Sequence, residues 1–138
     1  MSKDDRKPPA ILEAALYAED LEAAEAFYAG VLGLPVVARQ SCRHVFFRVR
    51  DGVLLVFRAS ATEAGDTGPV PGHGARGPGH LCFAASAAEL EDWVARLKAA
   101  HVPIEADVRW PGGARSIYLR DPAGNSLEFA EPRLWAES

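Results

Sequence analysis

The sequence predicts an α+β fold made of two paired βαβββ modules. Three observations lead to this prediction. Each half of the chain reads as one short strand, one amphipathic helix and then three further short strands. A stretch rich in Gly and Pro, residues 60–78, links the two halves. The length of 138 residues and the hydrophobic content of 49% suit one domain with its own core.

The first module is predicted over residues 11–59. An apolar strand over 11–18 leads to Asp20, whose carboxylate can cap a helix. Apolar residues then recur at helical spacing until Gly33, which ends the helix. The pair Asp51-Gly52 is typical of a hairpin turn. The three remaining strands are expected at 35–41, 43–49 and 53–59.

The second module is predicted over residues 79–132 and repeats this order. Its first strand spans 80–85, and Ser86 with Glu89 forms the capping-box pattern of a helix start. The segment Asp121 to Asn125 reads as a tight turn, because Pro fixes one dihedral angle while Gly and Asn accept positive φ. The remaining strands are expected at 102–108, 114–120 and 125–131.

Composition limits the class of protein. Residues 1–10 are predicted to be a loose charged leader, and residues 133–138 a short tail. A net charge of −4 argues against nucleic acid as a partner. No apolar run approaches the roughly 20 residues that cross a bilayer, so no membrane association is expected. The two cysteines form no disulfide framework, and a reducing cytoplasm is the expected compartment.

Strand alternation places three ionisable side chains on one surface. If the two modules pair by symmetry, Glu13, His80 and Glu128 all lie on the sheet surface that faces away from the helices. Two carboxylates and one imidazole suit a divalent ion such as Mn²⁺, Fe²⁺, Zn²⁺ or Ni²⁺. Without a metal, one carboxylate would hold a proton or pair with an arginine, for which Arg115 is a candidate.

The segments LYAEDLEAAEAFYAGVLGL, GPGHLCFAA and YLRDPAGNSLEFAEP resemble the vicinal oxygen chelate superfamily. This group includes glyoxalase I, bleomycin-resistance proteins, fosfomycin-resistance enzymes and extradiol dioxygenases. The resemblance extends from about Ile11 to Pro132. It implies that the two modules form a curled sheet cup with the helices outside and a divalent metal at its base. It also implies a homodimer, in some relatives with modules exchanged between subunits.

The resemblance further implies a set of metal ligands. The family takes them from four positions, in the first and last strands of each module. In this sequence those positions are Glu13, where relatives usually have His or Gln, then Val56, His80 and Glu128. Val56 cannot coordinate, so the implied set is Glu13, His80 and Glu128. This set resembles the three-ligand layout of fosfomycin-resistance enzymes, and it does not match the two-His, one-carboxylate triad of iron oxygenases.

Seven side chains are expected to line the substrate pocket, because ligand sites are mostly apolar with a few placed polar groups. They are Tyr17, Phe47, Val56, Cys82, Trp110, Arg115 and Tyr118. Phe46 is the alternative to Phe47. Trp110 stands on a loop, where it either caps a ligand or packs under the chain end. Cys82 is expected to be a small buried apolar residue.

The leading hypothesis is a small glyoxalase-like metalloenzyme with lyase, isomerase or transferase chemistry. Its metal would hold two neighbouring oxygens of a small substrate, and Glu13 or Glu128 would move the proton. The rival is a metal-free protein of the bleomycin-resistance kind, which sequesters an aromatic or cationic drug. A dioxygenase is a further alternative. Glu13 and Val56 both depart from the glyoxalase I ligands, and they favour the rival modestly.

Overall fold

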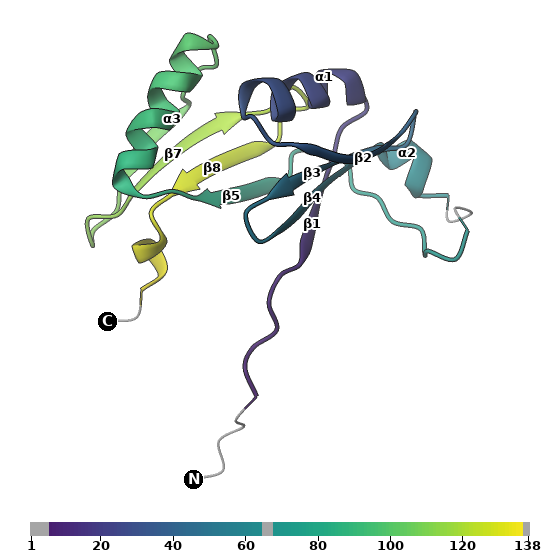
Figure 1. The fold of residues 1–138 in the computed structure, drawn as a ribbon, viewed down its shortest axis with the longest axis horizontal. Helices are drawn as coiled ribbons and strands as arrows, with labels where there is room; N and C mark the ends of the chain where they lie inside the picture. The colour runs from purple at the N-terminus through teal and green to yellow at the C-terminus, as the bar shows by residue number, and fades with distance from the viewer. Residues whose placement is uncertain (1–5, 65–67, 137–138) are drawn as a thin grey trace.

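The computed structural model describes residues 6–64 and 68–136, and it confirms the predicted α+β class (Figure 1). Each module contains one four-stranded sheet. The elements of module one are β1 (Glu13–Tyr17), α1 (Leu21–Glu25), the π-helix η1 (Ala26–Val31), β2 (Val36–Gln40), β3 (His44–Val49) and β4 (Gly52–Phe57). Those of module two are β5 (His80–Ala84), α3 (Ala87–Ala99), β6 (Ala106–Arg109), β7 (Arg115–Arg120) and β8 (Ser126–Ala130).

Two short helices lie outside this scheme. The helix α2 (Ala59–Thr62) begins the segment that was expected to be an irregular linker, and the 3-10 helix η2 (Pro132–Trp135) follows β8. No described helix is long and apolar enough to cross a membrane.

Both sheets have the same strand order. It is β1-β4-β3-β2 in module one and β5-β8-β7-β6 in module two. The first strand of each module pairs in parallel with the last one, and the other neighbours are antiparallel. Figure 1 shows α1 and α3 on the same side of the two sheets. We call the surface of each sheet that faces away from these helices its open face.

Local sequence chemistry starts both main helices as predicted. Asp20 accepts a hydrogen bond from the Ala23 backbone N–H at 3.0 Å. Ser86 and Glu89 form a complete capping box, in which each side chain accepts from the backbone N–H of the other. The first helix does not continue as a regular α-helix, because residues from Ala26 onward form the wider turns of η1.

Gly52 has a different role from the one that its hairpin position suggests. It begins β4, and a Cβ atom there would overlap the carbonyl oxygen of Leu12. The Val53 N–H donates to that same carbonyl at 3.1 Å. Gly52 is therefore required because Leu12, just before β1, approaches the backbone of β4 closely.

One hydrophobic core lies between the helices and the sheets and includes both modules. Its largest fully buried members are Tyr28, Phe47, Leu54, Leu90, Leu97, Ile117, Leu119 and Leu127. In β8, Leu127 and Phe129 belong to this core, so the residues between and beside them face the other way.

A buried polar network joins the two modules inside this core. The Tyr28 hydroxyl donates to Asp121 Oδ2 at 2.7 Å, and the Asn125 side-chain amide donates to the same oxygen at 2.9 Å. Asn125 also donates to the carbonyl of Tyr17 at 3.1 Å and accepts from the Gly79 N–H at 2.7 Å. The turn before β8 is thus bonded to η1, to the end of β1 and to the start of β5.

Substitution of Asp121 should destabilise the whole domain. Asp121→Ala leaves the Tyr28 hydroxyl and two backbone N–H groups without their acceptor in a buried site. We expect a loss of about 2–4 kcal/mol in the free energy of unfolding, measured by urea denaturation. Asp51→Ala, in the exposed β3–β4 turn, is the matched control and should change it by less than about 0.5 kcal/mol. Equal effects of the two substitutions would contradict this role of Asp121.

Candidate functional site

His80 and Glu128 form a close pair on the open face of module two. They come from neighbouring parallel strands, β5 and β8, in which His80 pairs with Ser126 and Cys82 with Glu128. His80 Nε2 lies 3.2 Å from Glu128 Oε1. The Glu128 side chain is buried, with 8% of its surface exposed, whereas about half of the His80 ring surface is exposed. The pair therefore presents a carboxylate at depth and an imidazole toward solvent.

The hydrogen bonds of His80 determine which ring nitrogen faces Glu128. His80 Nδ1 lies 3.0 Å from the Ser126 carbonyl oxygen. A carbonyl only accepts, so Nδ1 carries the proton, and in the neutral ring Nε2 points a lone pair at the carboxylate. His80 Nε2 and Glu128 Oε1 then both present lone pairs to each other, and at this distance they require a proton or a cation between them.

Glu128 also has an oxygen without a partner. Oε2 is buried and has no hydrogen-bond partner among the described residues. Leaving a buried carboxylate oxygen unpaired is costly, and such a group calls for an explanation such as a bound ion. The donor set at this point, one imidazole and one carboxylate, suits borderline divalent cations.

Two neighbours of Glu128 are held in their neutral forms. Burial of the thiol and then the Glu128 charge raise the pKa of Cys82 to about 12. Burial first and the Glu128 charge second also raise the pKa of the Tyr118 hydroxyl. The Tyr118 ring lies against the His80 ring, with centroids 6.3 Å apart. Cys82 is an exposed residue, so the expectation of a buried position was wrong.

Trp110 lies beside the same open face. Its indole Nε1 donates to Ser116 Oγ at 2.8 Å, and Ser116 of β7 is fully buried. Trp110 itself is half-buried in the loop that follows β6. The hydrogen bond fixes the indole against the sheet, near Tyr118, which lies on the same face of β7 as Ser116, whereas Ile117 between them faces the core.

Glu13 is not part of this group within one chain. It is an exposed residue on β1, in the other sheet, where it pairs with Val53. Among residues 6–64 and 68–136, no three His, Cys, Asp or Glu side chains are placed to hold a metal ion together. The expected convergence of Glu13, His80 and Glu128 within a single chain is therefore reduced to the His80–Glu128 pair.

Val56 was assigned to the wrong face. It is fully buried in the core on the helix side of β4, so it lines no pocket. Backbone hydrogen bonds show the correct alignment of the modules: Ala18 donates to Phe57 as Ala85 donates to Ala130, both at 2.9 Å. Two residues before these acceptors stand Leu55 and Glu128, which are therefore the equivalent pair.

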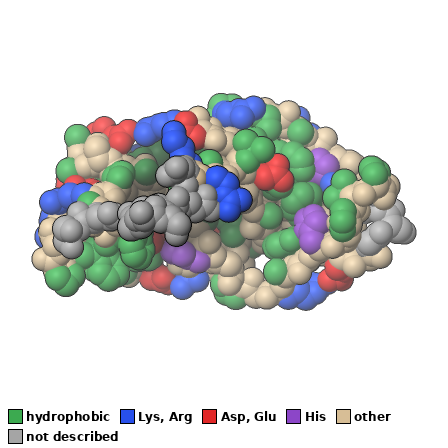
Figure 2. All heavy atoms as spheres, turned by 90° about the horizontal axis from the view of Figure 1, so that it is seen from below, with side chains coloured by type: hydrophobic (Ala, Val, Ile, Leu, Met, Phe, Trp, Pro, Cys, Tyr) green, Lys and Arg blue, Asp and Glu red, His purple; other side chains and the backbone are tan. Residues whose placement is uncertain are grey.

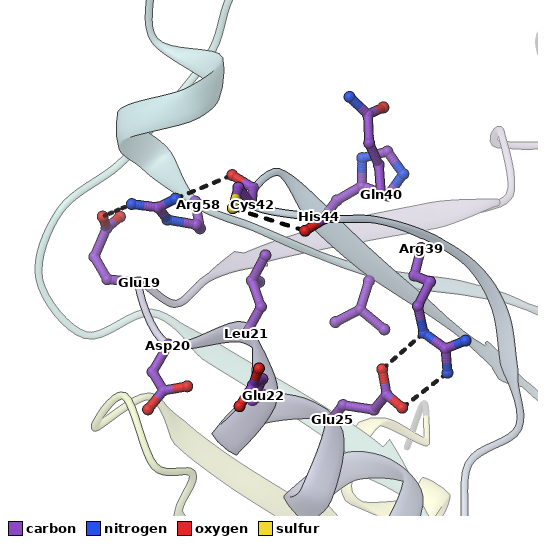
Figure 3. A pocket seen from close by; sticks show the side chains of 12 residues that line it. Glu19, Asp20, Leu21, Glu22, Glu25, Arg39, Gln40, Cys42, His44 and Arg58 are labelled. Carbon is purple, nitrogen blue, oxygen red and sulfur yellow. Dashed lines mark hydrogen bonds and ion pairs between the residues drawn. The ribbon is translucent and has the colours of Figure 1, made fainter.

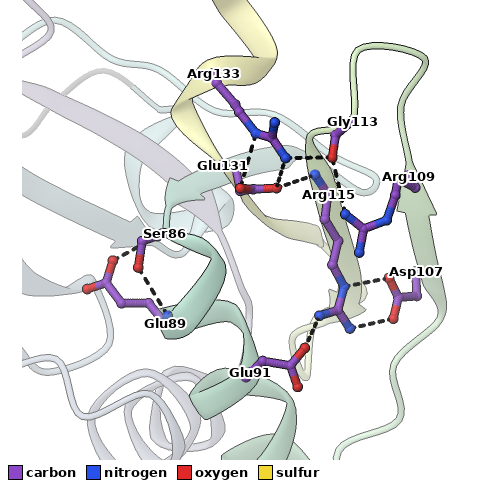
Figure 4. A network of polar contacts seen from close by, with 9 residues as sticks. All are labelled: Ser86, Glu89, Glu91, Asp107, Arg109, Gly113, Arg115, Glu131 and Arg133. Carbon is purple, nitrogen blue, oxygen red and sulfur yellow. Dashed lines mark hydrogen bonds and ion pairs between the residues drawn. The ribbon is translucent and has the colours of Figure 1, made fainter.

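Phe47 and Arg115 also lie away from the open faces, so their assignment to the pocket was wrong. Phe47 is fully buried against Tyr28, with ring centroids 5.3 Å apart. Arg115 forms ion pairs with Glu91 of α3 at 2.5 Å and with Asp107 of β6 at 2.7 Å (Figure 4). These two carboxylates occupy the guanidinium, which leaves Arg115 a structural link between helix and sheet.

The open face of module one carries a cluster of rings, which the sequence analysis found only in part. Tyr17 is half-buried there, and its hydroxyl lies 2.6 Å from His73 Nδ1. Its other members are His44, Phe46, Phe57 and His73. Alternation along β3 could have identified Phe46, because Phe47 and Val45 are both core residues. The position of His73 depends on the fold of the linker, for which the sequence has no local signal.

A cavity of about 630 Å³ lies elsewhere, between the start of α1 and the β2–β3 hairpin (Figure 3). Acidic residues line one side, but Arg39 pairs with Glu25 at 2.8 Å and Arg58 lies 3.7 Å from Glu19. The cavity contains none of the residues that were predicted to form the site. The two ion pairs offset part of the acidic charge of its lining.

Removal of the Glu128 charge should make Cys82 more reactive. A nearby anion disfavours the thiolate, so Glu128→Gln lowers the pKa of Cys82 and increases the thiolate fraction at a given pH. We expect a several-fold faster alkylation of Cys82 by iodoacetamide at pH 9, followed by mass spectrometry of the modified peptide. Cys42, in the other module, is the internal reference, and Glu105→Gln is the control variant. An unchanged rate in Glu128→Gln would contradict the proximity of the two groups.

The chain is similar to known proteins of one family. A family model described as "Glyoxalase/Bleomycin resistance protein/Dioxygenase superfamily" matches residues 10–129. A lactoylglutathione lyase from Agrobacterium tumefaciens is 47% identical, with a TM-score of 0.90, and the match covers 96% of this chain and 100% of that one. The comparison with curated proteins found no match.

Two more distant structures share the fold. A glyoxalase/bleomycin resistance protein/dioxygenase from Nocardioides is 24% identical, with a TM-score of 0.72 and coverage of 91% of this chain and 85% of that one. TioX from Micromonospora sp. ML1 is 22% identical, with a TM-score of 0.70 and coverage of 89% and 98%. The paired βαβββ modules and these matches show that the chain belongs to the glyoxalase/bleomycin resistance protein/dioxygenase superfamily.

Proposed function

We propose that this protein is a metal-dependent, glyoxalase-like enzyme that acts on a small substrate with two neighbouring oxygens. The observation that carries the proposal is the His80–Glu128 pair. The Nε2 lone pair of His80 faces Glu128 Oε1 at 3.2 Å, and Glu128 Oε2 is buried without a partner. Both features fit a divalent cation bound at this point.

The residues around the pair would orient it for metal binding. The Ser126 carbonyl holds the Nδ1–H of His80, which keeps Nε2 free to coordinate. The buried position of Glu128 keeps its carboxylate in place. When bound, a divalent metal would act as a Lewis acid toward the two substrate oxygens. Mn, Fe, Zn and Ni all suit a nitrogen and oxygen donor set.

A second copy of the chain would complete the site. Two ligands from one chain are fewer than the three that metalloenzymes commonly supply. Glu13 is exposed on β1, and it follows Ile11 and Leu12, whose exposed fractions are 83% and 72%. Exposed apolar residues of this size favour contact with another protein surface. We therefore propose a homodimer in which Glu13 of one protomer joins His80 and Glu128 of the other.

The proton of the reaction would be carried by this chain's own groups. Glu13, the exposed carboxylate, or Glu128 Oε2, the unpaired oxygen, would accept a proton from substrate carbon and return it to the neighbouring position. The Tyr118 hydroxyl, whose pKa is raised, stays protonated and can donate a hydrogen bond beside Glu128. The ring of Tyr118 and the indole of Trp110 would limit water at the site.

The most similar of these relatives suggests a substrate. Because a 47% identical protein is a lactoylglutathione lyase, we propose a lyase reaction on lactoylglutathione or a related thioester. The two cysteines of the chain are free thiols, which accords with work in a reducing cytoplasm. Metal-free sequestration of a drug is the competing function, and the separation of Glu13 from His80 within one chain is the observation in its favour.

Substitution of the pair should weaken metal binding. We expect His80→Asn and Glu128→Gln each to weaken binding of Zn²⁺ or Ni²⁺ at least about tenfold, measured by calorimetry on chelator-treated protein. The controls are His101→Asn, at an exposed position with a φ of 59° that Asn accepts, and Glu105→Gln. Both controls should bind metal like the unmodified protein.

Activity is then tested on the metal-loaded protein. Formation or cleavage of lactoylglutathione is followed through the thioester absorbance. His80→Asn and Glu128→Gln should both lose this activity. Glu13→Gln should also lower the activity if Glu13 of one protomer completes the site of the other. Absence of stoichiometric metal, combined with binding of aromatic compounds, would overturn the enzyme in favour of a sequestering protein.

A further inference from the structure

We propose that the open face of module one contains a separate subsite for an aromatic carboxylate, formed by Arg43 and the rings of His44, Phe46 and Phe57. The subsite would take a planar ring on its aromatic surface and an acidic group at the guanidinium. The subsite itself involves neither His80 nor Glu128.

The rings pack into one continuous cluster, in which Phe57 is buried and the half-buried His44 and Phe46 provide the accessible ring surface. His44 stacks on Phe46 with centroids 4.1 Å apart and an interplanar angle of 13°. Phe57 meets Phe46 edge-on at 5.3 Å and His73 edge-on at 4.6 Å. Viewed from the side opposite the helices, histidine side chains lie among hydrophobic ones (Figure 2). Aromatic faces arranged in this way favour a flat ligand ring in offset or edge contact.

Arg43 supplies the charge. Its Cζ lies 5.4 Å from the centre of the Phe57 ring, and its NH1 lies 2.6 Å from His44 Nδ1. The guanidinium can only donate, so His44 Nδ1 accepts. Burial, and then the Arg43 charge, lower the pKa of His44, which keeps that ring neutral. His44 thus positions Arg43 without neutralising it.

The guanidinium of Arg43 has no carboxylate partner among the described residues. Two other half-buried arginines differ in this respect. Arg58, which follows β4, lies near Glu19, and Arg115 of β7 lies between Glu91 and Asp107. A half-buried guanidinium held over the Phe57 ring and lacking an internal anion is complementary to an anionic ligand. Its planar fork matches a carboxylate in two parallel hydrogen bonds.

The inter-module segment closes one side of the subsite. The His73 N–H donates to the Thr62 carbonyl at 3.0 Å, and the His73 ring contacts the Tyr17 hydroxyl at 2.6 Å. Arg76 pairs with Glu63 at 2.6 Å and ties this segment to the residue after α2. His73 is therefore held as a wall beside Phe57, which sets a limit to the ligand on that side.

The test measures binding of three small probes to the chelator-treated full chain by calorimetry and ligand-observed NMR. Benzoylformate contains both a ring and a carboxylate, pyruvate lacks the ring, and benzyl alcohol lacks the acid. We expect benzoylformate to bind at least about tenfold more tightly than either of the others, because only it uses both halves of the subsite. Equal binding of benzoylformate and pyruvate would overturn the aromatic half of the proposal.

Two variants test the residues. Arg43→Gln should weaken benzoylformate binding at least about tenfold, and Phe46→Leu should weaken it several-fold without altering the guanidinium. Arg48→Gln, which changes an exposed arginine on β3, the strand of Phe46, should leave benzoylformate binding unchanged. Thermal unfolding confirms that each variant is folded. No binding of benzoylformate at millimolar concentration, or an unchanged affinity in Arg43→Gln, would overturn the proposal.

A further arm separates this proposal from the proposed metal site. His80→Asn and Glu128→Gln should bind benzoylformate like the unmodified protein, because the subsite lies at the Phe57 end of β4, whereas Glu13, which the proposed dimer brings to the His80–Glu128 pair, lies beside Val53 at the other end. Loss of benzoylformate binding in these variants would place the acid at the His80–Glu128 pair and overturn the subsite. If these two variants lose metal binding but keep benzoylformate binding, the result concerns only the proposed function and supports a separate subsite. Displacement of benzoylformate by inorganic phosphate at equal concentration would show a general anion site and likewise overturn the aromatic assignment.

Discussion

One buried carboxylate holds the two modules in a fixed relation. Asp121 lies in the turn before β8. It accepts hydrogen bonds from the Tyr28 hydroxyl of module one and from the side-chain amide of Asn125. Burial and the Asp121 charge raise the pKa of Tyr28, so its hydroxyl keeps its proton as donor. Because Asn125 bonds both Tyr17 and Gly79, the strands that carry the two open faces are tied to the same turn. The geometry of each face depends on this bonding.

The two halves share a backbone plan but differ in surface chemistry. The open face of module two is polar and places an imidazole next to a buried carboxylate. The open face of module one is aromatic, and Leu55 stands at the position equivalent to Glu128. A duplicated fold thus offers two unlike surfaces, one suited to holding a cation and the other to holding a flat group.

Local chemistry predicted the parts of the fold that depend on neighbours in sequence. The caps at Asp20 and Ser86 and the alternation around Glu128, which stands between Leu127 and Phe129, are correct because polar and apolar residues mark each position. Alternation fails in β4, where every residue from Val53 to Phe57 is apolar and both faces look alike. The carboxylates that occupy Arg115 lie 8 and 24 residues away in sequence, beyond what local patterns report. The position of Glu13 relative to His80 and Glu128 depends on how the modules pack together, and the pattern within a single strand does not predict this packing.

The π-helix η1 has a consequence for how this chain tolerates changes in length. In η1 the Leu32 N–H donates to the carbonyl of Phe27, five residues back, at 3.0 Å. The wide turn absorbs one additional residue while Leu32, 3% exposed, still reaches the core. If the same residues formed a regular α-helix, the side chains that follow η1 would be rotated by about 100° around the helix axis. One residue more than a regular turn holds is thereby accommodated within the helix, ahead of β2.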